Sequence, residues 1–424
     1  MATAFKGDDE TIAYEINSAP HDWDVTRPEI YAEDRWQSIF AEMRARAPIN
    51  KIIGTDYGTY WNITTLKIIQ HVEALPDIFS SDIHQGGITL SPIREDILPD
   101  GTAVIMPMFI AMDRPKHTEE RRVIAPAFTP GEMERMSTEI RARTGALLDS
   151  LPIGEEFDWV DLVSIELTTQ MLAILFDFPW ADRRKLTEWS DYAGDVEAFR
   201  TQERRDTRLA KVYEMGAYFQ RLWAERSSKG EAPDLISRMI HSPMKEMDQL
   251  EYMGNLILLI VGGNDTTRNS MTGYAYGLHK FPDEREKLEQ NPDLIPGAVS
   301  EIIRWQTPLA HMRRTALVDY DLFGAPIKEG DKLGLWYLSA NHDDDVFPDA
   351  SKLIVDRENA RRHLSFGYGI HRCVGARLAE LQIRILLEEM AARRLRVNVL
   401  AEPERVSACF VHGYKHLQVE LSHY

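Results

Sequence analysis

Residues 366–375 read Phe-Gly-Tyr-Gly-Ile-His-Arg-Cys-Val-Gly, and the chain continues into an amphipathic stretch, Val374–Arg394, that predicts a helix. Gly367 and Gly369 permit positive φ angles, so the loop can turn tightly. Cys373 stands directly before the predicted helix, where free backbone N–H groups and the helix dipole stabilise a thiolate. Such a thiolate can act as a nucleophile, a redox centre or a metal ligand, and a structural cysteine explains this loop equally well when it is taken alone.

The longest predicted helix, Asp248–Lys280, contains no proline and extends for about 30 residues, roughly 45–50 Å. Its apolar middle is interrupted by Gly-Gly-Asn-Asp-Thr-Thr at 262–267. The two glycines cost about 1–2 kcal/mol of helix propensity. The Thr266 hydroxyl can also bond the carbonyl of Gly262, four residues earlier, and loosen the helix. We therefore expect this segment to serve a bound ligand.

The composition, with 44% hydrophobic and 27% charged residues, is that of a globular protein and excludes disordered or collagen-like chains. The formal charge of −18 argues against a nucleic-acid partner and against a polybasic membrane anchor. The two cysteines, Cys373 and Cys409, indicate a reducing compartment rather than a disulfide scaffold. The apolar run Leu256–Val261 is far shorter than the ~20 residues that span a bilayer, so we expect a cytoplasmic protein without a membrane anchor.

The organisation of the chain shows no linker-like change in composition. We expect one domain over residues 1–424, mainly α-helical with a smaller β part. Clustered glycines and prolines predict a long irregular loop over residues 86–107. The predicted helical regions are Glu119–Lys245 and Gly297–Trp305, and the predicted strands are Tyr60–Thr64, Lys332–Leu338, Leu395–Leu400 and Leu417–Leu421.

The loop at 366–375 resembles the haem-binding loop of the cytochromes P450, F-G-x-G-x-H-x-C-x-G, and every fixed position of that pattern is present. The resemblance implies a triangular, mainly α-helical fold with α-rich and β-rich regions around a buried haem b (iron protoporphyrin IX). It implies that Cys373 is the axial thiolate ligand of the iron. It also implies that His371 bonds a haem propionate, that Phe366 packs beside the sulfur, and that Gly367 and Gly369 shape the turn.

A structural network is implied by a second match. Residues 301–304, Glu-Ile-Ile-Arg, resemble the E-x-x-R helix of the same family. The resemblance implies that Glu301 and Arg304 bond each other and Arg357, away from the substrate. An isolated E-x-x-R is also a common surface ion pair on any helix.

The residues implied for the haem propionates come from two further matches. Residues 113–121 resemble the family's D-P-P-x-H-x-x-x-R segment, although Arg114 replaces the usual second residue. His117 and Arg121 are four positions apart and share one helix face, so both can reach one propionate. Arg314 resembles the arginine that pairs with the other propionate. Ordinary surface charge is the alternative for all three.

The segment at 262–267 resembles the family's oxygen-activation sequence, [A/G]-G-x-[D/E]-T-[T/S]. The resemblance implies catalytic roles for Asp265, as part of a proton route, and for Thr266, whose hydroxyl assists oxygen activation. Proton transfer of this kind needs a carboxyl group with a pKa matched to neutral pH or a water relay to one.

Longer strings, including Val261–Gly273 and Arg304–Ala316, resemble the bacterial subfamily of soluble terminal alkane and fatty-acid hydroxylases. The resemblance implies a monooxygenase that uses O2 to hydroxylate the ω-carbon of medium-length chains. A hydroxylase of terpenoid or small cyclic or aromatic hydrocarbons is the alternative. A haem-thiolate sensor or electron carrier is a different class, which has no need of an Asp265–Thr266 pair. Substrate contacts are expected from residues that core packing would also explain: Ile88, Leu90, Leu258, Val261, Gly262, Leu309, Met312 and Phe410.

The source of electrons is expected to be a separate protein, because no G-x-G-x-x-G fingerprint for flavin or nicotinamide follows a predicted strand. The resemblance implies a 2Fe-2S ferredoxin and an NAD(P)H-dependent ferredoxin reductase. Arg361, Arg362, Arg372 and Arg377 surround the cysteine loop in sequence and could form a basic patch that steers an acidic ferredoxin. The alternative is that these arginines bond propionates or structural carbonyls.

Overall fold

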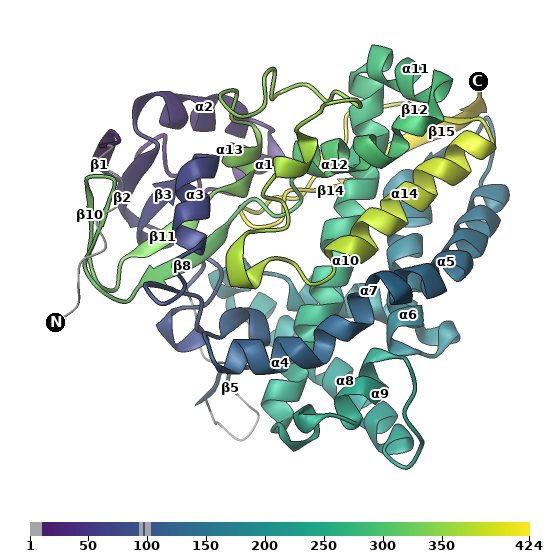
Figure 1. Cartoon of the computed structure of the whole chain (residues 1–424), viewed down its shortest axis with the longest axis horizontal. Helices are drawn as coiled ribbons and strands as arrows, with labels where there is room; N and C mark the ends of the chain where they lie inside the picture. Colours follow the sequence, from purple (N-terminus) through teal and green to yellow (C-terminus); the bar gives the residue numbers. More distant parts are fainter. Residues whose placement is uncertain (1–10, 93–95, 98–102) are drawn as a thin grey trace.

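The computed structural model describes residues 11–92, 96–97 and 103–424, so the part of the predicted loop over 93–95 and 98–102 lies outside the described residues. Helices occupy one side of the molecule and the larger sheet the other, which confirms the mainly α fold with a smaller β part (Figure 1). The shorter helices are α1 (Glu29–Ala32), α2 (Trp36–Arg46), α3 (Leu66–Glu73), α4 (Lys116–Ile124), α6 (Glu166–Phe176), α7 (Arg184–Ala193), α9 (Leu235–Ile240), α11 (Pro282–Gln290), α12 (Ile295–Gln306) and α13 (Tyr337–Asn341).

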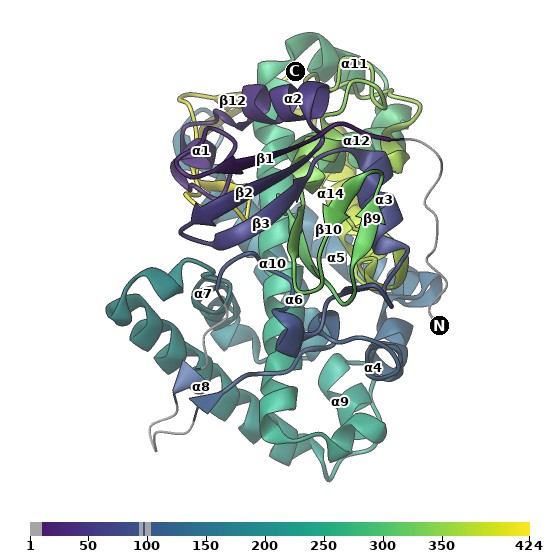
Figure 2. The same cartoon turned by 90° about the vertical axis from the view of Figure 1, so that its left-hand side faces the viewer.

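The central element is α10 (Gln249–Lys280), which runs through the middle of the molecule (Figure 2). Its 32 residues confirm the predicted single long helix. The Asp248 side chain caps the start by accepting a hydrogen bond from the Glu251 backbone N–H, at 2.9 Å. Neighbouring helices enclose α10, so packing rather than helix propensity holds it in place. The other long helices are α5 (Pro130–Ser150), α8 (Gln202–Arg226) and α14 (Ala376–Ala392).

The largest sheet has six strands in the order β1-β2-β3-β11-β8-β4. The β1–β2 and β3–β11 pairs are parallel and the other pairs are antiparallel. The strands are β1 (Tyr14–Ser18), β2 (Ile49–Thr55), β3 (Gly58–Ile63), β11 (Lys332–Leu335), β8 (Met312–Ala316) and β4 (Phe79–Ser80). The predicted strand Lys332–Leu338 is wrong beyond Leu335, because this residue pairs with Ile63 and Met312, each at the end of its own strand. Trp336 still donates its backbone N–H to the Ile63 carbonyl at 2.9 Å, and the chain then turns into α13.

The smaller sheets complete the β part. One of them has the order β12-β15-β7, and its strands β12 and β15 confirm the two strands predicted near the C-terminus. The strands of this sheet are β12 (Leu395–Val399), β15 (Gln418–His423) and β7 (Glu156–Asp158). Three further sheets have two strands each. They pair β5 (Asp96–Ile97) with β6 (Ala103–Val104), β9 (Tyr320–Leu322) with β10 (Ala325–Ile327), and β13 (Glu404–Arg405) with β14 (Tyr414–His416). Across the described ranges, no helix combines the length and the apolar character needed to cross a membrane.

Candidate active site

A cavity lies between α10 and the loop that precedes α14, with about 1370 Å³ of space free of protein atoms when its opening to solvent is included. Thr266 lines it from α10, and Cys373 lines it from the loop. Segments distant in the sequence meet here because α10 crosses the whole molecule (Figure 1). The two glycine-containing motifs of the sequence thus face a common space.

The cysteine loop is held by its own backbone. The Cys373 backbone N–H donates to the Phe366 carbonyl at 2.8 Å. Gly369 has a φ of +65°, and a Cβ there would lie 2.4 Å from the Glu73 carbonyl oxygen, so glycine is required. Cys373 stands just ahead of α14, and its thiol is exposed to the cavity. Burial raises the pKa of this thiol, while the N–H groups of Gly375 and the next residue lower it.

Two imidazoles face each other at the edge of the cavity. The ring centroids of His117 and His371 are 4.3 Å apart, and both nitrogens of each ring are buried without a hydrogen-bond partner. Burial together with nearby arginines lowers the pKa of His117 to about 4 and that of His371 to about 2. Both rings are therefore neutral near pH 7. Four unpartnered buried nitrogens are unusual in a folded protein and point to a missing polar ligand.

Two arginines complete this edge. Arg121 on α4 lines the cavity and donates to the Arg372 carbonyl at 2.5 Å. Arg314 on β8 also lines the cavity, and its guanidinium lies 2.8 Å from the Glu73 carboxylate. His117, Arg121, Arg314, His371 and Cys373 are hereafter called the cofactor seat.

The cofactor seat fits a haem. Unpartnered imidazole nitrogens and two guanidinium groups suit the carboxylates of a dianionic macrocycle, and one thiol suits its iron. Among the described residues there is no cluster of three or more His, Cys, Asp or Glu side chains that could hold a metal ion. An iron that brings four ring nitrogens with it needs only the single protein ligand that Cys373 offers.

The groove in α10 has the geometry that its sequence predicts. The Thr266 hydroxyl donates to the Gly262 carbonyl at 2.9 Å, and both residues line the cavity. Gly262 is exposed although it lies in the middle of the helix, because it faces this cavity. The hydroxyl and the loosened carbonyl therefore place polar atoms on the wall opposite Cys373.

Asp265 lies beside the groove but does not line the cavity. Its carboxylate accepts hydrogen bonds from Ser190 at 3.1 Å and from Arg268 at 3.0 Å. Burial raises the pKa of Asp265, Arg268 opposes this rise and Asp191 adds to it. Arg268 also pairs at 2.8 Å with Asp191, whose side chain is 50% exposed, so charged groups connect the buried carboxyl to the surface. Sequence reasoning missed Arg268 and Ser190, although the i,i+3 spacing from Asp265 was a signal for the arginine.

The expected substrate residues divide into two groups. Those that line the cavity are Ile88, Leu258, Gly262, Leu309 and Met312. Leu90 is fully buried against Gly334, Val261 packs near Gly194, and the Phe410 ring lies 5.5 Å from that of His311, so the structure does not bring these three to the cavity. Sequence reasoning missed several apolar members of the wall, since nothing in their local pattern separates them from core: Phe109, Ile110, Phe128, Met171 and Leu175.

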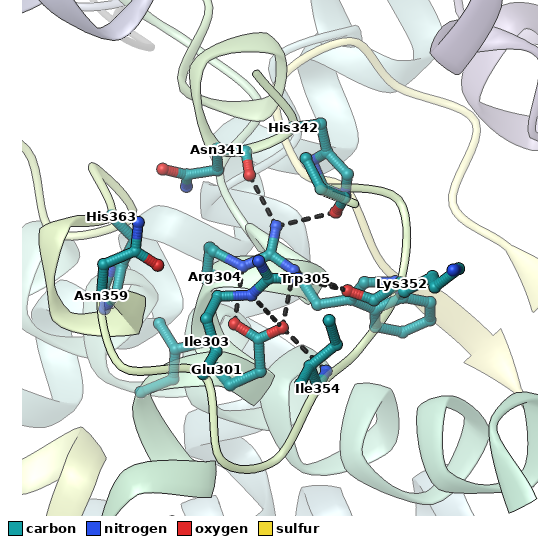
Figure 3. A network of polar contacts seen from close by, with 12 residues as sticks. Glu301, Ile303, Arg304, Trp305, Asn341, His342, Lys352, Ile354, Asn359 and His363 are labelled. Atoms are coloured by element: carbon teal, nitrogen blue, oxygen red, sulfur yellow. Dashed lines mark hydrogen bonds and ion pairs between the residues drawn. The ribbon is translucent and has the colours of Figure 1, made fainter. Parts of the chain in front are cut away.

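The network expected from the E-x-x-R match is buried away from the cavity (Figure 3). Arg304 donates two hydrogen bonds to the Glu301 carboxylate, both at 2.7 Å, and Arg357 donates a third at 3.0 Å. The side chains of Glu301 and Arg304 are 0% exposed. Arg304 also donates to three backbone carbonyls, that of Asn341 at the end of α13 and those of Ala350 and Lys352 in the coil that leads to the cysteine loop.

A second hollow lies on the other side of the cysteine loop, where Phe366 and Gly369 form part of its wall. Its exposed cationic side chains are Arg361, Arg362, Arg372, Arg377 and Arg384. Glu134 and Glu380 are the acidic members. A surface with a local excess of positive charge therefore adjoins the loop on a chain whose formal charge is −18.

Comparison with known proteins agrees with this geometry. The cytochrome P450 family model matches residues 153–399. Cytochrome P450-153 from Novosphingobium aromaticivorans is 61% identical with a TM-score of 0.90, covering 95% of this chain and 100% of that one. CYP153D17 from Sphingomonas sp. PAMC 26605 is 64% identical with a TM-score of 0.89, covering 94% and 99%.

Curated proteins give the same result at lower identity. Linalool 8-monooxygenase of Pseudomonas putida is 34% identical over 403 residues, covering 94% of this chain and 98% of the relative. Methyl-branched lipid omega-hydroxylase of Mycobacterium tuberculosis is 31% identical over 412 residues, covering 92% of each. The chain therefore belongs to the cytochrome P450 family, which binds haem, and it is a P450 monooxygenase.

Proposed function

We propose that this monooxygenase hydroxylates the terminal methyl group of a medium-length alkane or fatty acid: R–CH3 + O2 + 2e⁻ + 2H⁺ → R–CH2OH + H2O. The observation that carries the proposal is the apolar wall near Thr266, to which Leu258, Leu309 and Met312 contribute. The charged side chains of the cavity, Arg121 and Arg314, belong to the cofactor seat. A hydrocarbon therefore gains about 25 cal/mol for each Å² that it buries and meets no charged side chain of the cavity outside the cofactor seat.

Selectivity for a methyl group demands positioning, because a methyl C–H bond is harder to break than a methylene C–H bond. A narrow apolar channel that admits only the end of a chain supplies this positioning. Similarity to an omega-hydroxylase of methyl-branched lipids supports the same regiochemistry. Similarity to linalool 8-monooxygenase supports a second candidate, the hydroxylation of a terpenoid.

The cofactor seat is proposed to bind haem through named atoms. The Cys373 sulfur is the iron ligand, and the imidazoles of His117 and His371 donate to propionate oxygens. Arg121 and Arg314 supply the compensating positive charge. Haem, when bound, supplies an iron that activates O2 for insertion of one oxygen atom into a C–H bond.

Asp265 and Thr266 are proposed to manage protons. The Thr266 hydroxyl, whose own proton goes to the Gly262 carbonyl, presents its oxygen to the cavity as a hydrogen-bond acceptor at the oxygen-binding side. Asp265 takes up protons that reach it from the surface beside Asp191, while Arg268, which stays protonated, orients the two carboxylates. A carboxyl group whose pKa is raised by burial is suited to passing these protons on.

Electrons are proposed to come from a 2Fe-2S ferredoxin served by an NAD(P)H-dependent reductase. The arginines around the second hollow fit an acidic protein surface, and they lie on the thiolate side of the cofactor seat. A cytoplasmic location belongs to the same proposal, since Cys409 is a free, buried thiol and Cys373 must stay reduced.

The test is a substrate-binding titration followed by product analysis, with octane, decanoic acid, limonene and a small aromatic. We expect octane or decanoic acid to shift the haem spectrum and to yield the terminal alcohol. Oxidation of limonene or the aromatic alone would overturn the proposal in favour of the second candidate or its cyclic relatives. Cys373→Ser removes the characteristic spectrum of the reduced carbon-monoxide complex, whereas Cys409→Ser, a thiol outside the cavity, leaves it unchanged.

A further inference from the structure

Glu73, the last residue of α3, is a buried carboxylate that no motif singles out. Its Oε1 accepts hydrogen bonds from Arg314 at 2.8 Å and from the Tyr337 hydroxyl at 2.6 Å. Its Oε2 accepts one from the Tyr368 backbone N–H at 2.9 Å, and its own carbonyl packs on Gly369. One side chain therefore joins β8, α13 and the cysteine loop.

All three hydrogen bonds run toward the carboxylate, and this arrangement favours its ionised form. Burial raises the pKa of Glu73, while Arg314, Tyr337 and Tyr368 oppose this rise. Glu73 itself is 3% exposed. A buried negative charge of this kind persists only with close cationic and hydrogen-bonding partners.

The position of Glu73 gives it a role toward the cofactor. Arg314 and Tyr337 both line the cavity, and Glu73 stands behind them. The Arg314 guanidinium is thus held from the back, at fixed geometry, and Glu73 offsets part of its positive charge. Without Glu73 the same guanidinium would present more net positive charge at the edge of the proposed haem site.

We propose that Glu73 is a positioning residue that sets both the orientation of Arg314 and the electrostatic potential at the haem. The inference rests on the proposed haem seat and extends it to a residue that does not line the cavity. Reduction adds one electron to the iron, so a negative charge nearby disfavours it and an uncompensated positive charge favours it. Glu73 therefore keeps the reduction potential of the haem low.

The experiment measures the midpoint potential of the purified holoenzyme and its variants by reductive titration. Glu73→Gln keeps the shape of the side chain and removes its charge. We expect the equilibrium constant for reduction to rise by about three- to tenfold, where tenfold corresponds to 59 mV for a one-electron couple. Glu73→Asp keeps the charge, and we expect its potential to stay within about threefold of the parent value on the same scale.

The control is Glu166→Gln on α6, which also removes a buried carboxylate but one that pairs with Arg183 and Arg184 outside the cavity. It should leave the potential unchanged. Equal shifts in Glu73→Gln and Glu73→Asp, or no shift in either, would overturn the proposal. If Glu73→Gln fails to retain haem, retention by Glu73→Asp supports the charge argument, and loss from both variants overturns it. A parent protein without the thiolate spectrum would instead refute the proposed haem seat itself.

Discussion

Glu301→Gln is the most demanding test of the buried network in Figure 3. The substitution preserves side-chain volume and removes one negative charge. Glu301 accepts from Arg304, Arg357 and the Ile354 backbone N–H, and no water reaches its side chain, which is 0% exposed. The neutral amide cannot balance two guanidinium groups, and its NH2 group faces donors instead of acceptors.

The magnitude follows from this burial. Breaking a buried ion pair on one side costs about 3–5 kcal/mol, because the remaining charge stays desolvated and unpaired. Unfolding entropy of about 2.1 cal/mol/K for each of the 424 residues gives about 0.9 kcal/mol/K for the chain. The expected loss in Tm is therefore about 3–6 °C for a transition that is close to two-state.

The assay is thermal unfolding of the holoenzyme, followed in parallel by far-ultraviolet circular dichroism and by the haem absorption. The matched control is Glu33→Gln, which removes a carboxylate 2.6 Å from Arg35 in a pair whose side chains are 50% and 58% exposed. The Glu33–Arg35 distance is nearly the same as the 2.7 Å between Glu301 and Arg304. Loss of the exposed pair should nevertheless leave Tm unchanged within error, because water screens the two charges. Equal shifts in the two variants would refute the claim that burial, rather than distance, decides the contribution.

Three other expectations concern catalysis, electron delivery and pH. Asp265→Asn should slow turnover by about 10²-fold. Thr266→Ala should keep substrate binding while releasing more hydrogen peroxide per electron pair. If both variants keep the full turnover rate and form as much product per electron pair as the parent, protons take another route. Arg372→Glu should slow reduction by ferredoxin but not by dithionite, and the reduction rate of the parent protein should fall as added salt screens the arginines around the second hollow. The control Lys229→Glu, at an exposed position, should have no effect on either rate. A reduction rate that is insensitive to both salt and Arg372→Glu would place ferredoxin docking elsewhere. Burial and the neighbouring Glu251 raise the pKa of Glu120 to about 7 from an ordinary 4.5. The contribution of this group to stability is therefore greatest below pH 4.5 and falls as pH rises to about 7, because the folded state binds the extra proton in that range. Glu120→Gln should remove this part of the pH dependence in urea titrations, and an unchanged slope would contradict the assignment.

The local motifs were predictable from sequence because their chemistry is encoded in short spacings. Gly369 must be glycine where the loop passes the Glu73 carbonyl, and the Thr266 hydroxyl reaches the Gly262 carbonyl one helical turn away. The length of α10 was predictable because no proline interrupts it. Family resemblance then connected these segments to haem and oxygen.

The apolar wall of the cavity was less predictable. Leu258 lines it, whereas Leu90, proposed on the same grounds, is fully buried in the core. Apolar side chains gain the same free energy from water exclusion in a core as in a pocket, so hydrophobicity cannot separate the two. Only the packing of distant segments around α10 decides which of them faces a substrate.

The residues that tune the site were decided by tertiary structure alone. Sequence determined that Cys373 follows a glycine loop and that His117 and Arg121 share one helix face, because each depends on its near neighbours. It did not determine that Glu73 stands behind Arg314, a pair separated by 241 positions in the chain. The sequence also did not determine the ion pairs that Arg268 makes with Asp265 and Asp191, because they form only when α7 packs beside α10. Charges far apart in sequence become partners only when folding removes the water between them, and that step depends on the whole structure.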